Sequence, residues 1–164
     1  MRIQGKVHKY GANIDTDVIL PGKYLSLSDA QELAKHCMEG VDPEFPRRVK
    51  PGDIIVAGSN FGSGSSREHA PVAIKAAGVS CIIAPNFARI FFRNAINIGL
   101  PVLETDEIQE VEAGELLEVD LEKGAIISPA RKRVYQAAPY PQALLDIIAA
   151  GGLVEYTRKR LAQK

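Results

Sequence analysis

The sequence predicts an α/β protein in which a compact, barrel-like sheet is flanked by helices. Three observations support this class. Residues 3–10 have the loose apolar alternation of a strand. Residues 53–103 alternate strand, helix, strand, helix and strand, which is typical of parallel pairing. Residues 116–128 contain two apolar runs around Glu122-Lys123-Gly124 and indicate a hairpin.

Length and composition favour a single domain over residues 1–164. The 20 basic residues equal the 20 acidic ones, so neither nucleic acid nor an anionic membrane is expected as a partner. The chain opens on a polar strand and has no membrane-length apolar run, which makes the cytoplasm the expected compartment. Cys37 and Cys81 form no CxxC pair, so we expect buried apolar thiols and no iron–sulfur cluster on this chain alone.

The segment after the first strand contains Asp15-Thr16-Asp17. An Asx-type turn would explain it, and two close carboxylates could bind a metal, but no His or Glu lies at a helpful spacing. We favour a polar loop that hydrogen-bonds to the main site or to a partner surface. A helix is expected over residues 30–38, with His36 as a structural or solvent-facing residue, and residues 40–48 predict an irregular loop.

The most informative stretch is residues 58–77, GSNFGSGSSREHAPVAIKAA, where a Gly/Ser-rich loop joins the strand 53–57 to a helix. Glycines let the backbone approach a ligand, and the free N–H groups at a helix start can bind an anion. Ser65, three residues before Glu68, fits a capping box that would begin the helix. The alternative is a separate short turn, with the longer helix starting at Pro71.

Arg67 distinguishes this loop from a plain strand-to-helix connector, which remains the other interpretation. A cation in the first turn opposes the helix dipole at a cost on the order of 0.3–1 kcal/mol when exposed, and a bound anion would reverse that cost. The spacing fits neither a Walker motif nor the dinucleotide fingerprint. The loop therefore predicts a site for a carboxylate or a phosphate.

A second strand and helix follow the central helix. We expect Gly78 to end the central helix, residues 79–84 to form a buried strand, and residues 88–98 to form an amphipathic helix. The expected apolar face of that helix consists of Ile90, Phe91, Ala95 and Ile98. Arg89 and Arg93 share another face, which is either solvated or in contact with a partner or substrate.

The last part of the chain is expected to complete the sheet and to add a helix. Residues 100–103 predict a strand, and Val134 with Tyr135 predicts a short edge strand after the hairpin. Residues 142–150 predict a helix with Pro141 near its first position, and the basic residues 153–164 are expected to be partly ordered.

The run Gly62-Ser63-Gly64-Ser65-Ser66-Arg67-Glu68-His69-Ala70 resembles the signature of the aconitase superfamily's small swivel domain. Residues 13–22 resemble that domain's N-terminal motif, residues 88–94 its second helix, and residues 97–101 the exit from it. The resemblance covers nearly the whole chain and implies a three-layer β/β/α swivelling domain. The short, free-standing form is similar to the small subunits of two-subunit hydro-lyases in this superfamily.

The resemblance also implies a chemistry and a partner. A large subunit would hold a [4Fe-4S] cluster, and no metal ligand is expected here. Ser65 would be the general base, activated by N–H groups at the helix start, while Ser66 and Arg67 would bind a substrate carboxylate. Supporting roles are expected for Asp15, Thr16, Asp17 and Gly64. Glu68 has only the capping role, and a structural role is expected for His69.

Substrate choice depends on Lys23-Tyr24-Leu25-Ser26-Leu27, because this loop faces the variable end of the substrate in the family. A homoaconitase-type loop resembles YLRT, in which arginine would pair with a distal carboxylate, whereas this chain has Ser26 there. An unpaired buried carboxylate is costly, while an isopropyl group gains about 0.8 kcal/mol per buried carbon. We therefore expect conversion of 2-isopropylmalate to 3-isopropylmalate, as in leucine biosynthesis.

Three alternatives stay open. Lys23 could replace the missing arginine, which keeps homoaconitate in view, and citraconate or methylmalate hydration belongs to the same family. A stand-alone anion-binding module without catalysis is the non-enzymatic alternative. A homo-oligomer of the isolated chain is also compatible with the sequence.

Overall fold

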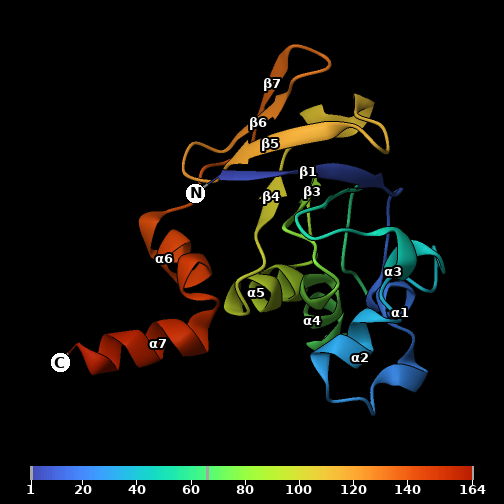
Figure 1. Cartoon of the computed structure of the whole chain (residues 1–164), viewed down its shortest axis with the longest axis vertical. Helices are drawn as coiled ribbons and strands as arrows, with labels where there is room; N and C mark the ends of the chain where they lie inside the picture. Colours follow the sequence, from blue (N-terminus) through green and yellow to red (C-terminus); the bar gives the residue numbers. More distant parts are fainter. Residues whose placement is uncertain (1, 66, 164) are drawn as a thin grey trace.

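The computed structural model describes residues 2–65 and 67–163, and a seven-stranded mixed sheet forms its centre (Figure 1). The strand order is β4-β3-β2-β1-β5-β6-β7. The strands are β1 Arg2–Lys9, β2 Ile54–Val56, β3 Cys81–Ala84, β4 Val102–Glu104, β5 Leu116–Asp120, β6 Ala125–Ser128 and β7 Arg133–Gln136. The helices are α1 Thr16–Ile19, α2 Ala30–Ala34, α3 Phe45–Arg48, α4 His69–Ala76, α5 Arg89–Asn97, α6 Gln142–Ala150 and α7 Leu153–Ala162, with 3₁₀ turns η1 Gly22–Tyr24 and η2 Glu107–Glu110.

The sheet has a parallel half and an antiparallel half that meet at β1. Strands β1, β2, β3 and β4 pair in parallel, while β5 pairs antiparallel with β1 and continues into β6 and β7. Every residue of β2 and β3 is buried, as expected for Ile/Val-rich strands covered on both faces. Helices α4 and α5 lie below the parallel strands in Figure 1, and the β5–β7 hairpins lie above. The predicted α/β class, with a barrel-like sheet flanked by helices, is confirmed.

The helix predicted over residues 30–38 is wrong in its length. Helix α2 ends at Ala34, and turns continue to Gly40. Met38 N donates to Ile19 O at 2.7 Å, and Gly40 N donates to Val18 O at 2.9 Å. These contacts with α1 need a turned backbone, with φ of +63° at Met38, so tertiary hydrogen bonds override local helix propensity.

Two smaller expectations also need correction. The stretch 40–48 is not wholly irregular, because Phe45 is fully buried and anchors α3. In α5 the buried residues are Phe91, Ala95 and Ile96, whereas Ile90 is 50% exposed and lies on the pocket side of the helix.

The other expected elements are present. Gly78 follows the last turn of α4 with φ of +106°, the β5–β6 hairpin forms as expected, and β7 lies at the sheet edge. Helix α6 has the predicted bounds, with Pro141 just before its first residue. Among the described residues, no helix is both long and apolar enough to cross a membrane.

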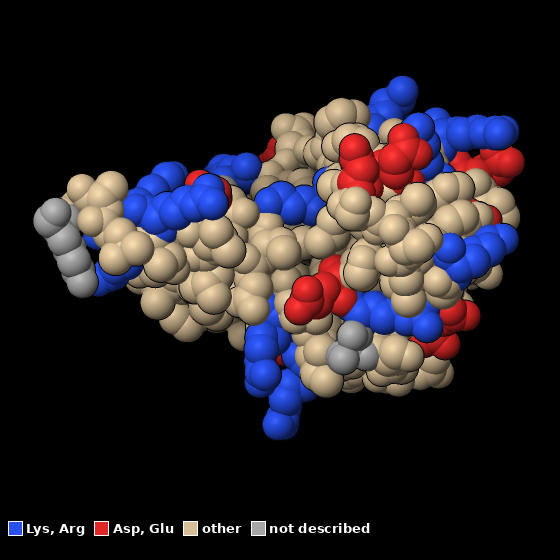
Figure 2. Space-filling model, turned by 90° about the horizontal axis from the view of Figure 1, so that it is seen from below, with Lys and Arg blue, Asp and Glu red and all other residues tan. Residues whose placement is uncertain are grey.

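Charge is spread over the surface. On the face shown in Figure 2, Lys and Arg side chains lie among acidic residues and broad uncharged areas rather than in one continuous field. This distribution agrees with the balanced composition of the chain.

Candidate active site

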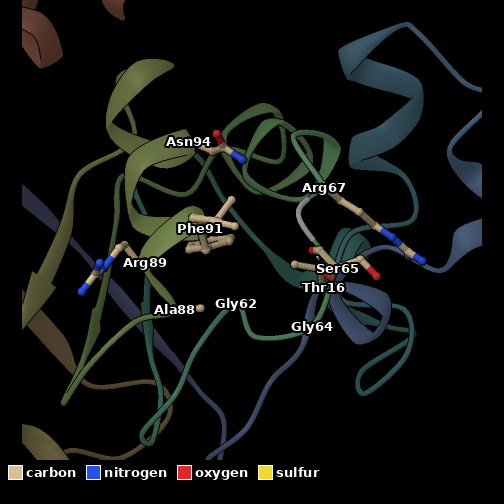
Figure 3. Close-up of a pocket in the computed structure, with 10 residues that line it drawn as sticks. Thr16, Gly62, Gly64, Ser65, Arg67, Ala88, Arg89, Phe91 and Asn94 are labelled. Atoms are coloured by element: carbon tan, nitrogen blue, oxygen red, sulfur yellow. Dashed lines mark hydrogen bonds between the residues drawn. The ribbon is translucent and has the colours of Figure 1, made fainter.

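The loop after β2 and the start of α5 enclose a pocket of about 200 Å³ (Figure 3). Thr16, on the first turn of α1, lies beside Ser65, across from Phe91 in Figure 3. The pocket is lined by Thr16, Gly62, Gly64, Ser65, Arg67, Ala88, Arg89, Ile90, Phe91 and Asn94. Two segments that resemble family motifs, the 62–70 loop and the 88–94 helix start, therefore share one cavity.

Hydrogen bonds join the loop to the segment around Asp15-Thr16-Asp17. Gly62 N donates to Ile14 O at 2.7 Å, and Thr16 N donates to Ser63 O at 2.8 Å. The buried Thr16 hydroxyl donates to Ser65 O at 2.9 Å. The predicted hydrogen bonds between this segment and the 62–70 loop are present, but the expected polar loop is wrong in part. Residues Thr16–Ile19 form the helix α1, which the Asp15 carboxylate caps through Val18 N at 2.9 Å.

Gly62 is required because Phe91 packs against the loop. The backbone at Gly62 has φ of +83°, and a Cβ there would lie 2.2 Å from Phe91 Cγ. Gly64 also has a positive φ, +91°, and its absent Cβ would lie 3.4 Å from Asp15 Cβ. The glycines therefore allow close packing between the loop, α1 and α5.

The predicted capping box at Ser65 is wrong. Helix α4 begins at His69, with Glu68 before it and no side-chain cap from Glu68. Because Thr16 binds the Ser65 carbonyl, Ser65 belongs to the loop rather than to the helix. The alternative start at Pro71 is also wrong, since Pro71 is the third residue of α4, where no helical N–H bond is required.

Ser65 itself is exposed at the edge of the pocket, and its Oγ has no hydrogen-bond partner among the described residues. Helix α4 starts four residues later, so the donors expected from a helix start at Ser65 are not placed by α4. Ser66 lies outside the described residues. His69 is half-buried and does not line the pocket.

Arg67 is held by Asp17, 50 residues earlier in the chain. Arg67 Nη1 donates to Asp17 Oδ1 at 3.0 Å and to Leu20 O at 3.3 Å, and its side chain is 20% exposed. The hydrogen bonds from Arg67 and Gly22 N hold the pKa of Asp17 below its ordinary value. The cation lies before α4 and already has a counter-charge, so the dipole cost expected from the sequence is offset within the protein.

The guanidinium keeps donors for a ligand. Within the described part of the chain, both hydrogen bonds of Arg67 come from Nη1, which leaves Nη2 and Nε unbonded. An arginine fork with a free edge can bind a carboxylate with two parallel hydrogen bonds. The side chain points away from Phe91, toward the N-terminal segment in Figure 3.

The loop Lys23–Leu27 follows Gly22, which lies near Arg67, and does not line the pocket. Gly22, just before it, donates its N–H to Asp17 Oδ1 at 3.1 Å, and a Cβ on Gly22 would lie 3.6 Å from Arg67 Nη2. Leu25 and Leu27 are half-buried against the core, while Ser26 is exposed. Part of the apolar surface expected to face the substrate therefore packs inside this protein.

Helix α5 supplies two kinds of side chain. Arg89 and Arg93 are both exposed, and Arg89 lines the pocket. Asn94 also lines it and was missed by the sequence analysis, although its position three residues after Phe91 places both on one helix face.

The donor set does not fit an iron–sulfur cluster, which needs several accessible thiolates. Cys37 and Cys81 are fully buried, and burial raises the pKa of both thiols, that of Cys81 to about 12. Among the described residues no three His, Cys, Asp or Glu side chains gather as a metal site. Asp15 and Asp17 are instead occupied by the α1 cap and by Arg67.

Comparison with known proteins supports the resemblance found in the sequence. Residues 2–107 match the family described as Aconitase C-terminal domain. The chain is 59% identical over 156 residues to the 3-isopropylmalate dehydratase small subunit of Halothermothrix orenii, covering 94% of each chain. It is 57% identical to the same-named protein of Aquifex aeolicus, covering 100% of this chain and 99% of that one. The crystal structure of 3-isopropylmalate dehydratase from Methanocaldococcus jannaschii superposes with a TM-score of 0.94 at 48% identity, covering 99% of this chain and 98% of that one.

Proposed function

This chain belongs to the Aconitase C-terminal domain family, among the 3-isopropylmalate dehydratase small subunits, and we propose that it performs the same role. It would act in a heteromeric hydro-lyase that isomerises 2-isopropylmalate to 3-isopropylmalate by dehydration and rehydration, in leucine biosynthesis. The observation that carries the proposal is the free edge of Arg67 beside the exposed Ser65 at one pocket. That pair offers a carboxylate ligand and a proton acceptor on one loop.

In this proposal Ser65 is the general base that removes the proton from carbon and later returns it. The Thr16 hydroxyl donates to the Ser65 carbonyl, and this bond fixes the backbone of Ser65 at the pocket edge. Arg67, with Ser66 next to it in sequence, binds a substrate carboxylate, and Asp17 keeps the guanidinium in place. Serine becomes a usable base only where surrounding donors stabilise its alkoxide, so closure of the site by further groups is needed.

A cluster-bearing large subunit would supply that closure. The pocket of about 200 Å³ is smaller than the roughly 300–1,000 Å³ usual for small-molecule sites, which favours a half-site completed by another surface. We place the [4Fe-4S] cluster on the large subunit, because the thiols of this chain are buried and protonated. The whole chain, residues 1–164, would be one swivel domain of this complex, and its cytoplasmic location stays a prediction.

The test is an anaerobic hydratase assay of this chain mixed with its large subunit. We offer 3-isopropylmalate and homocitrate separately and compare the wild-type chain with Ser65→Ala. Loss of a general base is expected to lower kcat by roughly 10²–10⁴-fold. Ser28→Ala is the matched control, because Ser28 is exposed and does not line the pocket.

The outcomes separate the alternatives. Activity on 3-isopropylmalate that Ser65→Ala abolishes and Ser28→Ala retains would support the proposal. A preference for homocitrate would assign the chain to a homoaconitase-type complex. If an intact cluster-loaded complex acts on neither compound, the substrate assignment is wrong, and citraconate and methylmalate are tested next. Tight anion binding by this chain without any activity would favour the non-catalytic module.

A further inference from the structure

Tyr24, in the loop Lys23–Leu27, contacts His36 and Glu39 from the turns that follow α2. The Tyr24 ring stacks on the His36 ring with centroids 3.7 Å apart and an interplanar angle of 9°. Tyr24 Oη donates to Glu39 Oε1 at 2.8 Å, and His36 Nδ1 donates to Glu39 Oε2 at 2.8 Å. Both oxygens of the Glu39 carboxylate are therefore used to fix the first turn of the loop against the turns that follow α2.

Lys23 is the only cation of this loop in the sequence, and the same cluster attracts it. Lys23 Nζ lies 5.2 Å from the centroid of the Tyr24 ring, in a cation–π arrangement. Partial burial raises the pKa of Glu39, but the hydrogen bonds from Tyr24 and His36, with the charges of His36 and Lys23, outweigh it and lower the pKa overall. Glu39 is thus a carboxylate at neutral pH, and it holds by a hydrogen bond the Tyr24 ring that Lys23 contacts.

The loop is also tied to the carboxylate-binding arginine. Asp17 Oδ1 accepts from both Arg67 Nη1 and Gly22 N, so one oxygen links the guanidinium to the residue that begins η1. A substrate carboxylate on Arg67 would therefore place the rest of the molecule near this loop. An apolar variable end of the substrate binds without a charged partner, whereas a variable end that carries a carboxylate needs a cation in the loop.

We propose that Glu39 determines substrate specificity by fixing the Tyr24 ring, over which Lys23 lies, so that Lys23 is held back from the variable end of the substrate. This inference rests on the proposed function. Glu39 acts through its neighbours and is a positioning residue, and none of the three side chains lines the pocket. Discrimination against a distal carboxylate then comes from a lysine held against the Tyr24 ring as well as from the serine at position 26.

The experiment uses the reconstituted complex with Glu39→Gln, which keeps the side-chain shape and removes the charge. The ratio of kcat/KM for 3-isopropylmalate to that for homocitrate is expected to fall about two- to fivefold, mainly through a lower KM for homocitrate. The double variant Glu39→Gln with Lys23→Met is expected to restore the wild-type ratio, because the released cation is gone. Tyr24→Phe removes one hydrogen bond only and should shift the ratio less, in the same direction.

Glu44→Gln is the matched control, since Glu44 pairs with Arg47 at 3.4 Å on an exposed turn away from the loop. An unchanged ratio in Glu39→Gln, in a wild-type complex that prefers 3-isopropylmalate, would overturn this inference and leave the proposed function intact. Equal losses on both substrates would also overturn it, because the role of Glu39 would then be structural. A wild-type complex that prefers homocitrate would overturn both.

Discussion

The two halves of the sheet use different physical means to hold their loops. In the parallel half, β2 and β3 are buried throughout, and the loops at their ends carry the pocket residues. In the antiparallel half, β6 and most of β5 alternate between buried and less buried positions, and Tyr135 is the one buried residue of β7. A buried strand gives its loop a rigid base, and the residues of the candidate site lie at the ends of the parallel strands.

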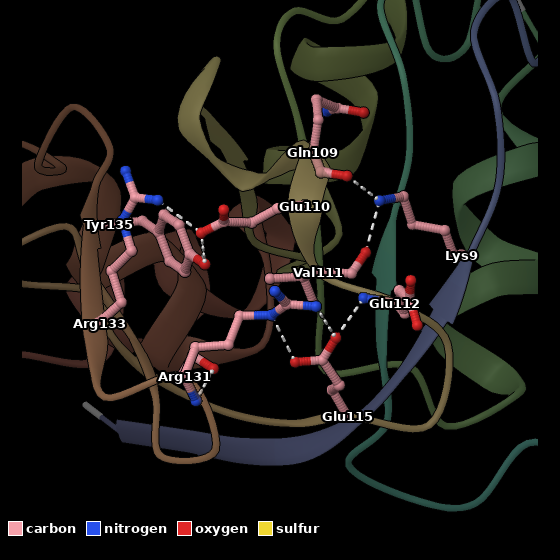
Figure 4. A network of polar contacts seen from close by, with 10 residues as sticks. Lys9, Gln109, Glu110, Val111, Glu112, Glu115, Arg131, Arg133 and Tyr135 are labelled. Carbon is pink, nitrogen blue, oxygen red and sulfur yellow. Dashed lines mark hydrogen bonds and ion pairs between the residues drawn. The ribbon is translucent and has the colours of Figure 1, made fainter.

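The η2 segment beside the antiparallel half is held to β1 and β7 by a polar network (Figure 4). Arg131 binds Glu115 through two hydrogen bonds of 2.8 Å, and Lys9 on β1 donates to the Gln109 and Val111 carbonyls. Glu110 accepts from Arg133 and from the buried Tyr135. The comparison teaches that changes near β2 should alter catalysis, whereas changes in this network should alter stability alone.

The largest expected effect on activity is that of a substitution at Arg67, in the loop after β2. Arg67→Lys keeps the charge but loses the fork, and a charged hydrogen bond is worth about 1.5–3 kcal/mol, so KM should rise roughly 10- to 100-fold. Steady-state kinetics of the reconstituted complex measure it. A rise in KM with little change in kcat is the expected pattern. If KM stays at the wild-type value, Arg67 does not bind the substrate carboxylate.

A second prediction compares one glycine from each half. Gly62 and Gly114 have similar backbone angles, φ +83° and +88°, but a Cβ would collide with Phe91 at Gly62 and meet nothing within 4 Å at Gly114. Gly62→Ala should lower the free energy of unfolding by about 2–4 kcal/mol and reduce activity, because overpacking adds to backbone strain. Gly114→Ala should lose only about 1–2 kcal/mol and retain activity.

Chemical denaturation of each variant, beside the hydratase assay, measures both quantities. Equal destabilisation by the two alanines would mean that Phe91 yields and that the loop is not held by this contact. Loss of activity in Gly114→Ala would contradict the separation between the two halves.

The sequence predicted the strands, the hairpin and the motif order, because these depend on local patterns of burial and turn residues. It failed where distant segments compete with local signals. Ser65 and Glu68 fit a capping box, yet the Thr16 hydroxyl, 49 residues earlier, donates a hydrogen bond to the Ser65 carbonyl and holds Ser65 in the loop. The pattern of residues 30–38 fits a helix, yet the N–H groups of Met38 and Gly40 donate to carbonyls of α1 instead.

The family resemblance named residues of the candidate site, but the sequence did not predict the contacts between them. The loop residues could be named from the sequence, but the pairing of Asp17 with Arg67 could not, because it depends on how α1 packs against the loop. The cluster of Tyr24, His36 and Glu39 was missed for a similar reason. It forms only after α2 stops early and the chain turns back.

The smallest effect is expected in the antiparallel network. Glu115→Gln should lower the free energy of unfolding by about 1 kcal/mol at pH 7, without changing activity. The hydrogen bonds from Arg131 lower the pKa of Glu115 from its ordinary 4.5, so its stabilisation is fully present above pH 4.5 and is lost as the pH falls through the lowered value. The difference between wild type and variant, measured by denaturation across this range, should therefore shrink below pH 4.5. Glu44→Gln, which removes one exposed contact of 3.4 Å, should differ little from wild type at any pH. A difference that persists in acid would show that Glu115 stabilises through packing rather than through its charge, and the contrast between loops held by buried strands and loops held by charge would then need revision.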